Sequence, residues 1–420
     1  MEIRKIPISQ VKPHPDNPRV PLTSQHSEYR QIKKSLKKFG LVLPLVCSSR
    51  TNYILGGNQR YSVLLTEGVK EVNVVFVDLD PQREKELMIA LNGIYGLWDY
   101  PKLADILRDF GQLPDFDFES IGFTVPDLSN ILDNHLPLQD DTFDFDAALE
   151  STKEPVTKKG DVISLGMHHR LMCGDATSEE DMCMLLGDTR VDLLDIDWPY
   201  NVNYMGGNCP RVDTRPKKSR RWSKIYSDNL PQSEYEVFMR KVLTNIKLNL
   251  KPGGVFYQWQ AHRQLGPLYQ ILIDLDFHVS CLICWKKQSA PISYADYSFQ
   301  TEQAVYGWLK GESHYFAGKP GASNLWEIKR DSTKLYEHPC QKPVSLAQKA
   351  IKNSTRLNDV VLDVFLGSGS VLIAAESLSR RCFAMELDPK YCDVIVKRYI
   401  NFVGKSKVSS EILNKYCEEV

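Results

Sequence analysis

The chain has 420 residues, of which 42% are hydrophobic and 25% charged, and its formal net charge is −1 at pH 7. This size and composition predict a globular protein of two or three domains. No apolar run approaches the roughly 18 residues needed to cross a bilayer, and the first residues lack a signal-peptide pattern, which excludes a membrane partner and predicts a cytoplasmic protein. Because the net charge is close to zero, any contact with nucleic acid requires local basic regions.

The ten cysteines lie scattered in apolar runs, so we expect reduced thiols rather than a disulfide framework. Cys281 and Cys284 have the spacing of half a zinc site. However, no second pair and no nearby histidine cluster completes a tetrahedral site, and the residues around them are typical of a strand. We therefore predict no metal site.

Residues 1–80 are expected to form a small α/β unit. Apolar residues recur at helical spacing from Ile32 to Phe39, with lysines on the other face, and Gly40 ends this helix. Two short strands then lead to a glycine turn at 57–60, after which a further helix begins.

The turn at Gly57, Asn58 and Arg60 has two interpretations. A helix amino terminus with an arginine suits an anion, so these residues are candidates for holding a nucleotide phosphate. Alternatively, glycine serves only the conformation of a strand-to-helix turn without a ligand. Together with Asn-Pro-Arg at 17–19, the turn resembles the ParB-like domain of partition proteins and, more distantly, sulfiredoxins. The resemblance implies phosphate binding without thiol chemistry, because Asn58 stands where sulfiredoxins have their reactive cysteine.

Composition and pattern divide the rest of the chain. Residues 81–135 are expected to form a helical extension. Residues 136–156 are rich in aspartate and weakly periodic, which predicts an acidic linker. A second domain is expected at 157–403, followed by a carboxyl-terminal tail at 404–420.

Asp197, Trp198, Pro199 and Tyr200 follow an apolar run at 191–196 that predicts a buried strand. The exocyclic amine of a base is a poor nucleophile because its lone pair is delocalised into the ring. Asp197 can accept one N–H and a backbone carbonyl of Trp198 or Pro199 the other, while Tyr200 stacks on the ring of a flipped base. The alternative is a strand that simply ends in a polar turn.

Residues 201–228 come directly after this tetrapeptide and combine basic with aromatic side chains. Such a run is usually a solvated loop. Beside a base pocket, however, it suits contacts to phosphates and closure over a flipped nucleotide. We therefore predict DNA contacts from five basic residues, Arg215, Lys217, Lys218, Arg220 and Arg221. Residues 286–335 are the candidate for sequence recognition.

A second motif runs from the apolar strand at 360–362 through Asp363 and a glycine turn at 367–369 into a helical segment. This strand-turn-helix unit is typical of a doubly wound sheet. The next strand ends at Glu386, at the distance where an acid normally holds a ribose. A nicotinamide dinucleotide is the rival ligand, but Leu372 replaces the third glycine of its fingerprint. S-adenosylmethionine, which carries no phosphate, fits the pattern better.

Three motifs together resemble the amino-methylating DNA methyltransferases, which make N6-methyladenine or N4-methylcytosine. They are the tetrapeptide at 197–200, His-Pro-Cys-Gln-Lys-Pro at 338–343 and Phe-Leu-Gly-Ser-Gly at 365–369. Their order is similar to that of the permuted subclass called beta, and the match covers roughly residues 157–403. The resemblance implies that S-adenosylmethionine is the cofactor and double-stranded DNA the substrate. The cofactor-binding residues that it implies are Asp363, Phe365, Gly367, Gly369, Glu386, Asp175 and Lys342, the last reaching the cofactor's carboxylate.

Two motifs depart from the usual family pattern. Trp198 stands in place of a proline, so a large ring is expected beside the base pocket, although the backbone carbonyl is retained. Ser370 and Cys340 each replace a threonine.

The predicted fold class is α/β, with a ParB/sulfiredoxin-like domain followed by a Rossmann-like methyltransferase sheet in permuted motif order. Adenine N6 is the expected target, since aspartate in the tetrapeptide is commoner in adenine enzymes of the family and serine in cytosine enzymes. Cytosine N4 is one alternative. Another is a ParB-like DNA-binding regulatory protein without catalysis, which Trp198 permits. The sequence leaves open a homodimer and a restriction partner.

Overall fold

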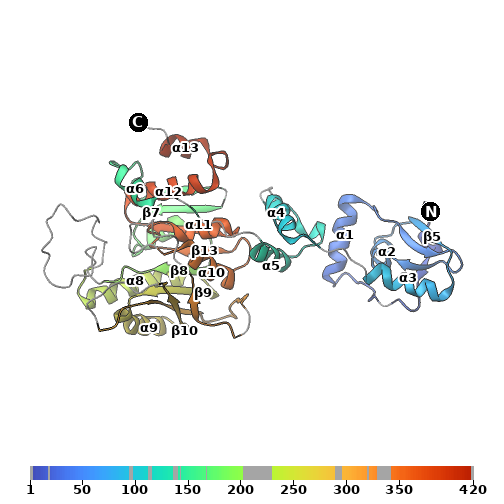
Figure 1. The fold of residues 1–420 in the computed structure, drawn as a ribbon, viewed down its shortest axis with the longest axis horizontal. Helices are drawn as coiled ribbons and strands as arrows, with labels where there is room; N and C mark the ends of the chain where they lie inside the picture. The colour runs from blue at the N-terminus through green and yellow to red at the C-terminus, as the bar shows by residue number, and fades with distance from the viewer. Residues whose placement is uncertain are drawn as a thin grey trace. The chain divides into compact units, whose positions relative to one another are not determined.

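A computed structural model describes residues 3–17, 19–93, 98–111, 116–135, 141, 143–166, 168–201, 229–288, 296–318, 321–328 and 342–417. The chain divides into two compact units, Met1–Leu136 and Pro137–Val420 (Figure 1). Each unit combines helices with a sheet, so the predicted α/β fold class is confirmed.

The first unit is built on a five-stranded sheet in the order β1-β5-β3-β4-β2. The strands are β1 (Ile3–Pro7), β2 (Lys12–Pro13), β3 (Leu45–Ser48), β4 (Tyr53–Gly56) and β5 (Glu71–Val77). The helices that accompany them are α1 (Ser27–Phe39), α2 (Asn58–Thr66) and α3 (Pro81–Gly93), with the short η1 (Ile8–Gln10). Leu45, Ile54 and Val74 are fully buried in the core between sheet and helices.

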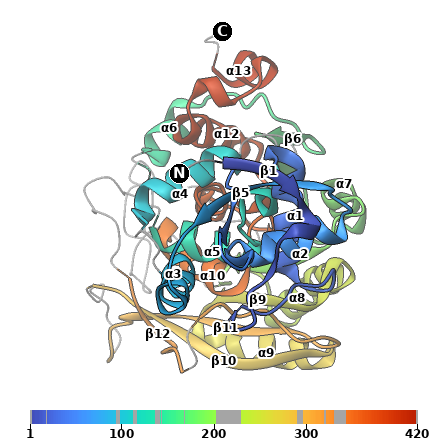
Figure 2. The same cartoon turned by 90° about the vertical axis from the view of Figure 1, so that its right-hand side faces the viewer.

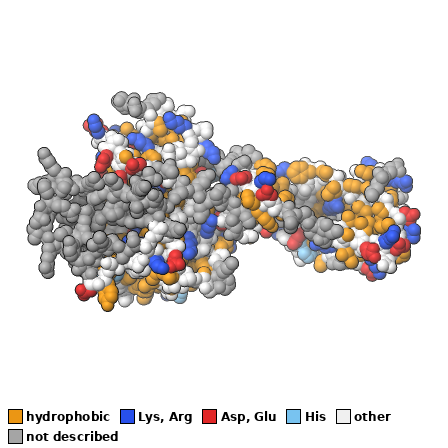
Figure 3. Space-filling view, viewed as in Figure 1, with side chains coloured by type: hydrophobic (Ala, Val, Ile, Leu, Met, Phe, Trp, Pro, Cys, Tyr) orange, Lys and Arg blue, Asp and Glu red, His pale blue; other side chains and the backbone are white. Residues whose placement is uncertain are grey.

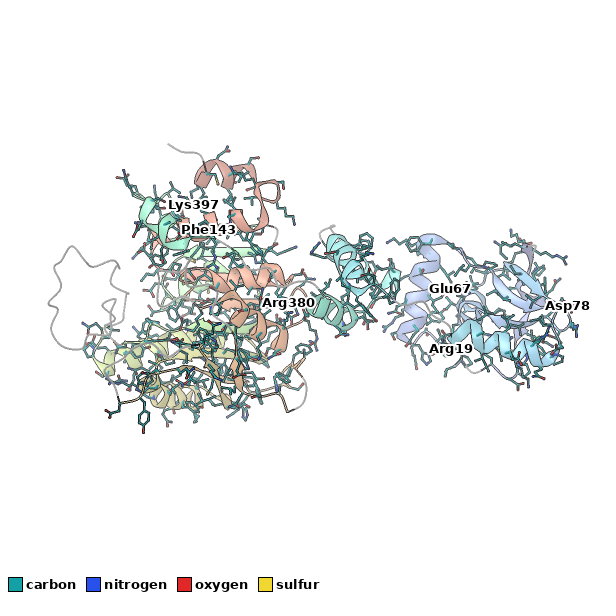
Figure 4. All side chains as sticks on the ribbon, in the orientation of Figure 1. Arg19, Glu67, Asp78, Phe143, Arg380 and Lys397 are labelled. Atoms are coloured by element: carbon teal, nitrogen blue, oxygen red, sulfur yellow. The ribbon has the colours of Figure 1, made fainter. Side chains whose placement is uncertain are left out.

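The remainder of this unit is helical. It contains α4 (Tyr100–Gly111), η2 (Phe118–Ile121) and α5 (Val125–His135). Lys34 of α1 contacts the carboxylates of Asp117 and Glu119 around η2, at 3.3 and 2.6 Å. Another carboxylate of the unit, Glu67 (labelled in Figure 4), accepts a hydrogen bond from the Tyr29 hydroxyl at 3.0 Å.

The second unit contains a nine-stranded mixed sheet in the order β12-β10-β11-β9-β8-β13-β14-β7-β6. Its strands are β6 (Val162–Leu165), β7 (His169–Cys173), β8 (Val191–Asp197), β9 (Leu250–Gln260), β10 (Phe277–Lys286), β11 (Thr301–Leu309), β12 (Leu325–Glu327), β13 (Val360–Asp363) and β14 (Arg381–Glu386). The five strands from β9 to β7 run parallel. Parallel strands covered on both faces are almost continuously apolar, which explains the runs seen in β8 and β13.

Helices cover both faces of this sheet. They are α6 (Phe145–Ser151), α7 (Glu179–Leu186), α8 (Gln232–Asn249), α9 (Leu265–Asp274), α10 (Val344–Ser354), α11 (Ser370–Ser377), α12 (Pro389–Val403) and α13 (Ser410–Cys417), with the short η4 (His262–Gln264) and η5 (Lys405–Lys407). Residues of α10, α11 and α12 share one buried cluster with the sheet, and those of α7, α8 and α9 share the other. Figures 1 and 2 both show α6 and α12 toward the top of the second unit and α9, beside β10, toward the bottom.

The order of connections reverses between β8 and β13, which are neighbours in the sheet. The chain continues from β8 to β9 on one side and from β13 to β14 on the other, while Leu193 and Val361 pair across the boundary. In open α/β sheets, ligands bind beyond the carboxyl ends of the strands at such a switch point. The edge at Asp197 and Asp363 is therefore the expected ligand crevice.

The described part of residues 136–156, predicted as an acidic linker, is packed onto the second unit. The Asp141 and Arg398 side chains are 2% and 1% exposed, and Arg398 Nε lies 2.5 Å from the Asp141 carboxylate. Asp144 caps α6 by accepting the backbone N–H of Ala147 at 2.9 Å. Phe143, which packs against the core cluster, is labelled in Figure 4. Asp141 thus pairs with an arginine and Asp144 caps a helix, whereas the composition suggested a linker.

The carboxyl-terminal residues also differ from the predicted tail. Helix α13 contacts the rest of the second unit through Tyr416, which is buried and lies 2.9 Å from the Thr157 hydroxyl. The backbone N–H of Thr157 in turn donates to Asp393 of α12 at 3.0 Å. The described residues up to 417 are therefore part of the fold.

Cysteine, metal and membrane features were searched over the described ranges. Cys281 and Cys284 are free thiols on β10, and no group of His, Cys, Asp or Glu in the described residues could hold a metal ion. Among the described helices, none is long and apolar enough to cross a membrane. On the face drawn in Figure 3, Lys and Arg side chains of the described residues are interspersed with acidic ones, in keeping with the near-zero net charge.

Candidate active site

The two predicted motifs meet at one edge of the sheet. Asp197 ends β8, Asp363 ends the neighbouring parallel strand β13, and the glycine turn follows immediately. The Trp198 ring packs on Phe365 of the second motif with centroids 5.2 Å apart. Segments more than 160 residues apart in sequence therefore form one site.

Asp197 is the carboxylate at the centre of this site. Its Oδ2 forms an ion pair with the Lys342 ammonium, and its side chain is 35% exposed. Its Oδ1 is buried and has no hydrogen-bond partner among the described residues. Burial raises the pKa of Asp197, while Lys342 acts in the opposite direction. The accessible side of the carboxylate is therefore the side that Lys342 contacts.

A second partly exposed carboxylate, Glu302 of β11, joins the same network. Its Oε1 lies 2.5 Å from Lys287 Nζ and its Oε2 lies 3.4 Å from Lys342 Nζ. Lys342 also donates to the Tyr200 hydroxyl at 2.8 Å, and that hydroxyl lies 3.4 Å from Glu302 Oε2. Burial opposes ionisation of Glu302, but the two lysines outweigh it and lower its pKa to about 2. Two carboxylates and two ammonium groups thus form a balanced set of charges around Tyr200.

The Trp198 ring is buried in the core, whereas a large ring beside a base pocket was predicted. Its side chain is 2% exposed and packs between Phe365 and Phe238, with centroid distances of 5.2 and 6.0 Å. The indole Nε1 donates to Gln258 Oε1 at 3.0 Å, so the polar atom of the ring is satisfied inside the core. The adjacent Pro199 carbonyl accepts from the Tyr235 hydroxyl at 2.6 Å. The tryptophan therefore anchors the tetrapeptide at 197–200 to the glycine motif.

Backbone hydrogen bonds to acidic side chains shape the glycine turn. Gly367 and Gly369 have φ values of 55° and 92°, in the left-handed region that favours glycine. Glu386 accepts the Gly367 N–H at 2.9 Å, and Asp363 accepts the Phe365 N–H at 2.9 Å. Because the Gly367 N–H is already bonded, the turn does not present it to a phosphate.

Buried carboxylates gather around this edge. Burial raises the pKa of Asp195 and of Glu386 to about 7 in each case. It also raises the pKa of Asp363 well above its ordinary value, with further increases from the charges of Asp195 and Asp197. Buried acidic groups are costly to ionise without a compensating cation. The site therefore favours a positively charged ligand and disfavours a pyrophosphate.

Asp175 follows the end of β7 and is engaged in a local turn. Its carboxylate accepts both the N–H and the hydroxyl of Thr177 at 2.8 Å, and its own N–H donates to Asp181 at 2.7 Å. In the sheet order, β14 lies between β7 and β13. The structure thus gives Asp175 a turn-stabilising contact, and its predicted role at the cofactor stays a prediction.

Several predicted residues lie outside the described part of the chain. These are the basic residues Arg215, Lys217, Lys218, Arg220 and Arg221, the first four residues of the motif at 338–343, and much of 286–335. Lys342 is the first described residue after that gap, and its carbonyl accepts from the Ser370 hydroxyl at 2.9 Å. This bond ties the third motif to the helix that follows the glycine turn.

The turn at Gly57, Asn58 and Arg60 is held by internal contacts. Arg60 donates to the Leu43 carbonyl at 2.5 Å, and burial lowers the pKa of its guanidinium. Asn58 is 6% exposed and donates to the Ile54 carbonyl at 3.2 Å. Gly57 has φ 92°, and a Cβ there would lie 2.8 Å from a Leu45 methyl group and 3.0 Å from the guanidinium. The left-handed backbone therefore favours glycine at this position, and any side chain there would displace the ends of the Leu45 and Arg60 side chains.

Sequence analysis missed Glu302, Lys287, Gln258 and Arg398. Arg398 donates to the Ser368 carbonyl of the glycine turn at 2.7 Å while pairing with Asp141. Each of these side chains contacts a site residue that lies far away in the sequence. No spacing along the chain therefore predicts the contact. For Glu302, Gln258 and Arg398, the available signal was a polar or charged residue within an otherwise apolar strand or helix.

Together, fold and site define a class of protein: a small α/β unit joined to a doubly wound α/β unit whose acidic site lies at the topological switch point. Residues 191–397 match the family model described as DNA methylase, and residues 1–93 match that of the ParB N-terminal domain. The chain therefore joins a ParB N-terminal domain to a DNA methyltransferase domain of the N6/N4 type.

Individual relatives agree with these matches. The Type II methyltransferase M2.MboI of Moraxella bovis is 24% identical over 226 residues, which span 50% of this chain and 81% of the relative. M.HinfI of Haemophilus influenzae is 27% identical over 185 residues, covering 39% and 51% of the two chains. Among solved structures, M1.HpyAVI in complex with SAM is 21% identical, with a TM-score of 0.41 over 55% of this chain and 98% of that one. The ParB protein of Caulobacter crescentus complexed with CTP-gamma-S is 18% identical, with a TM-score of 0.27 over 32% and 78%.

Proposed function

We propose that this protein transfers the methyl group of S-adenosylmethionine to adenine N6 of a base flipped out of double-stranded DNA. The observation that carries the proposal is the meeting of Asp197 with the glycine turn at the switch point between β8 and β13. A carboxylate that can hold an amine thereby lies at the edge where a cofactor is expected.

The acidic surroundings of the glycine turn support S-adenosylmethionine as the cofactor. Its sulfonium and ammonium charges match buried carboxylates whose pKa values are raised by burial, and it has no phosphate for them to repel. When bound, it supplies an electrophilic methyl group. Asp363, Phe365, Gly367 and Gly369 would line its site, and Glu386 would accept from the ribose hydroxyls.

The residues of the tetrapeptide would prepare the amine. Asp197 accepts an N–H of the exocyclic amine, which restores electron density to the nitrogen. Tyr200 offers its ring to the face of the base, and Trp198 and Pro199 hold the backbone through their contacts with Gln258 and Tyr235. The nitrogen would then attack the methyl carbon in a single step as the bond from that carbon to sulfur breaks, without a covalent enzyme intermediate. The uncharged thioether would leave, and the amine would lose one proton to Asp197 or to water.

The DNA contacts and the amino-terminal domain complete the proposal. Arg215, Lys217, Lys218, Arg220 and Arg221 would contact phosphates near the flipped base, and the protein would act on DNA in the cytoplasm. Gly57, Asn58 and Arg60 would form a phosphate site in the ParB-like domain. The contacts of Arg60 with Leu43 support a preformed turn there.

Nucleoside analysis tests the function and its target. The protein is incubated with isotopically labelled S-adenosylmethionine and unmodified DNA, and the digested nucleosides are separated by mass spectrometry. We expect labelled N6-methyladenine. Labelled N4-methylcytosine would correct the target base, whose assignment to adenine rests on the aspartate of the tetrapeptide. Cofactor binding without any labelled nucleoside would instead favour a non-catalytic DNA-binding protein.

A further inference from the structure

The Lys342 ammonium occupies the accessible side of Asp197. It forms an ion pair with Asp197 Oδ2, while Oδ1 is buried without a partner among the described residues. An amine N–H arriving from outside must therefore reach the oxygen that Lys342 already contacts. Both groups are nitrogen donors, and they compete for the same acceptor.

Glu302 provides Lys342 with a second carboxylate next to the first. Its Oε2 lies 3.4 Å from Lys342 Nζ and also 3.4 Å from the Tyr200 hydroxyl. The lysine side chain is 12% exposed, so leaving Asp197 for an uncharged environment would be costly. With Glu302 adjacent, a small rotation of the flexible lysine stem keeps the ammonium paired.

We propose that Lys342 holds the place of the target amine in the DNA-free enzyme and withdraws to Glu302 when the flipped base enters. Glu302 is then a positioning residue that governs base entry and does not touch the substrate. This inference rests on the proposed function, because it assigns Asp197 the role of amine acceptor. The two lysines that contact Glu302 keep its pKa far below neutrality, so it stays an anion throughout the working range.

The exchange also explains the position of Lys287. Its ammonium lies 2.5 Å from Glu302 Oε1, on the other oxygen from the one facing Lys342. Lys287 competes with Lys342 for the charge of Glu302 and so leaves Lys342 partly with Asp197. When the base enters, the Lys342 ammonium then needs only to shift from Asp197 toward Glu302.

The central test is Glu302→Gln, which keeps the shape of the side chain and removes its charge. Among the described carboxylates that pair with Lys342, Asp197 then keeps its charge and Glu302 does not, so the base competes less well for Asp197. We expect KM for DNA to rise about tenfold, with a smaller change in kcat, while S-adenosylmethionine affinity measured by calorimetry stays unchanged. An unchanged KM for DNA overturns the inference.

A double variant separates positioning from general damage. Adding Lys342→Met to Glu302→Gln removes the competing ammonium, so KM for DNA should fall back toward the wild-type value. A double variant with a higher KM than Glu302→Gln alone contradicts the place-holder role. The matched control is Lys287→Gln, which leaves Glu302 charged and frees it for Lys342, so KM should stay equal or decrease.

Folding and function failures are distinguishable in this design. If Glu302→Gln fails to fold, Glu302→Asp keeps the charge on a shorter side chain and should give an intermediate KM for DNA. Independently, an increase in KM for DNA in the Lys287→Gln variant overturns the inference. A wild-type protein that yields no methylated nucleoside overturns the proposed function itself. A wild-type protein that methylates DNA, with insensitive Glu302 variants, overturns only the place-holder role.

Discussion

The chain contains two glycine turns with nearly the same backbone and opposite electrostatic surroundings. Gly57 precedes α2 with φ 92° and ψ 20°, and Gly369 precedes α11 with φ 92° and ψ 15°. The first turn is packed against the guanidinium of Arg60, whereas the second lies beside the carboxylates of Asp363 and Glu386. A left-handed glycine before a helix therefore fixes the path of the chain, and the neighbouring charges determine which ligand the turn suits.

The comparison teaches how a resemblance in a short motif should be used. Either turn alone fits several ligands, because helix amino termini attract anions in general. At the second turn, buried acids oppose that preference, because a nearby anion would raise the free-energy cost of ionising them further. We therefore expect variants of the two turns to affect different ligands.

The largest expected effect is at the tetrapeptide 197–200, which packs against the motif of the acidic turn, the glycine turn at 367–369 with Asp363 and Glu386 beside it. Asp197→Ala removes the proposed amine acceptor, and we expect kcat to fall by on the order of 10³-fold, as for the loss of a key catalytic group. S-adenosylmethionine binding should persist, because Asp197 acts on the base. Methyl incorporation and calorimetry on the same preparation check both statements, and retained transfer would remove Asp197 from the mechanism.

The second largest effect concerns the buried Asp141–Arg398 pair, which contacts the glycine turn through the Ser368 carbonyl. Asp141→Asn leaves the buried Arg398 without its carboxylate, which should cost about 3 kcal/mol in the free energy of unfolding. The Ser368 carbonyl is held by the same arginine, so cofactor affinity should also weaken. Denaturant unfolding and calorimetry measure the two effects.

The matched control for this prediction is the exposed pair Lys85–Asp16 of the first unit. Asp16→Asn should leave both the midpoint of unfolding and cofactor binding nearly unchanged, because exposed pairs contribute little. Equal effects of the two substitutions would mean that the Asp141–Arg398 pair has no special role.

A smaller effect separates the two turns directly. Asp363→Asn preserves the shape of the side chain but removes a carboxyl group that a bound cation would favour in its ionised form, and S-adenosylmethionine affinity should fall about tenfold, equivalent to ~1.4 kcal/mol. Arg60→Gln changes the other turn and should leave that affinity alone. Titration calorimetry on both variants measures this difference. If Arg60→Gln weakens cofactor binding as much as Asp363→Asn does, the proposed distinction between the two turns is wrong.

The smallest effect is a dependence of cofactor affinity on pH. Burial raises the pKa of Asp195 and Glu386 to about 7, so both hold protons in the cofactor-free protein below that pH. A cationic ligand favours their ionised forms, and binding should therefore release protons and tighten as pH rises from 6 to 7. Calorimetry in buffers of different ionisation enthalpy measures the release, and proton uptake would contradict the cationic site.

The same pKa shifts make the stability of the cofactor-free protein depend on pH. A carboxyl whose folded-state pKa is about 7, against roughly 4 when unfolded, binds more protons in the folded state between those values. These two groups should therefore stabilise the fold as pH falls from 7 toward 4. Glu386→Gln should reduce this dependence in thermal unfolding, and an unaltered pH profile would argue against the shift.

Much of the central architecture was predictable because its determinants are local. The apolar runs at 191–196 and 360–362 predicted buried strands, and polar residues at their ends predicted one shared edge. The acid at Glu386 was predicted from its distance to Asp363, although its contacts with the Gly367 and Asp388 N–H groups were not. Pattern thus located the site within the sheet.

Partners from distant strands were not predictable. Trp198 turns into the core because Gln258, on the adjacent strand β9, accepts from its indole, and no spacing along the chain reveals that partner. Lys342 was expected to reach the cofactor's carboxylate, but its ammonium contacts Asp197, Tyr200 and Glu302. The segment around Asp141 was predicted as a linker for the same reason, since Arg398 lies far along the chain.

A crystal structure of the protein with S-adenosylmethionine tests the central claim most directly. The account predicts the sulfonium methyl on the open side of the Asp197 carboxylate, with the ribose at Glu386 and the adenosine beside the glycine turn at 367–369. A cofactor bound at another edge of the sheet, or one whose methyl group faces away from Asp197, would contradict it.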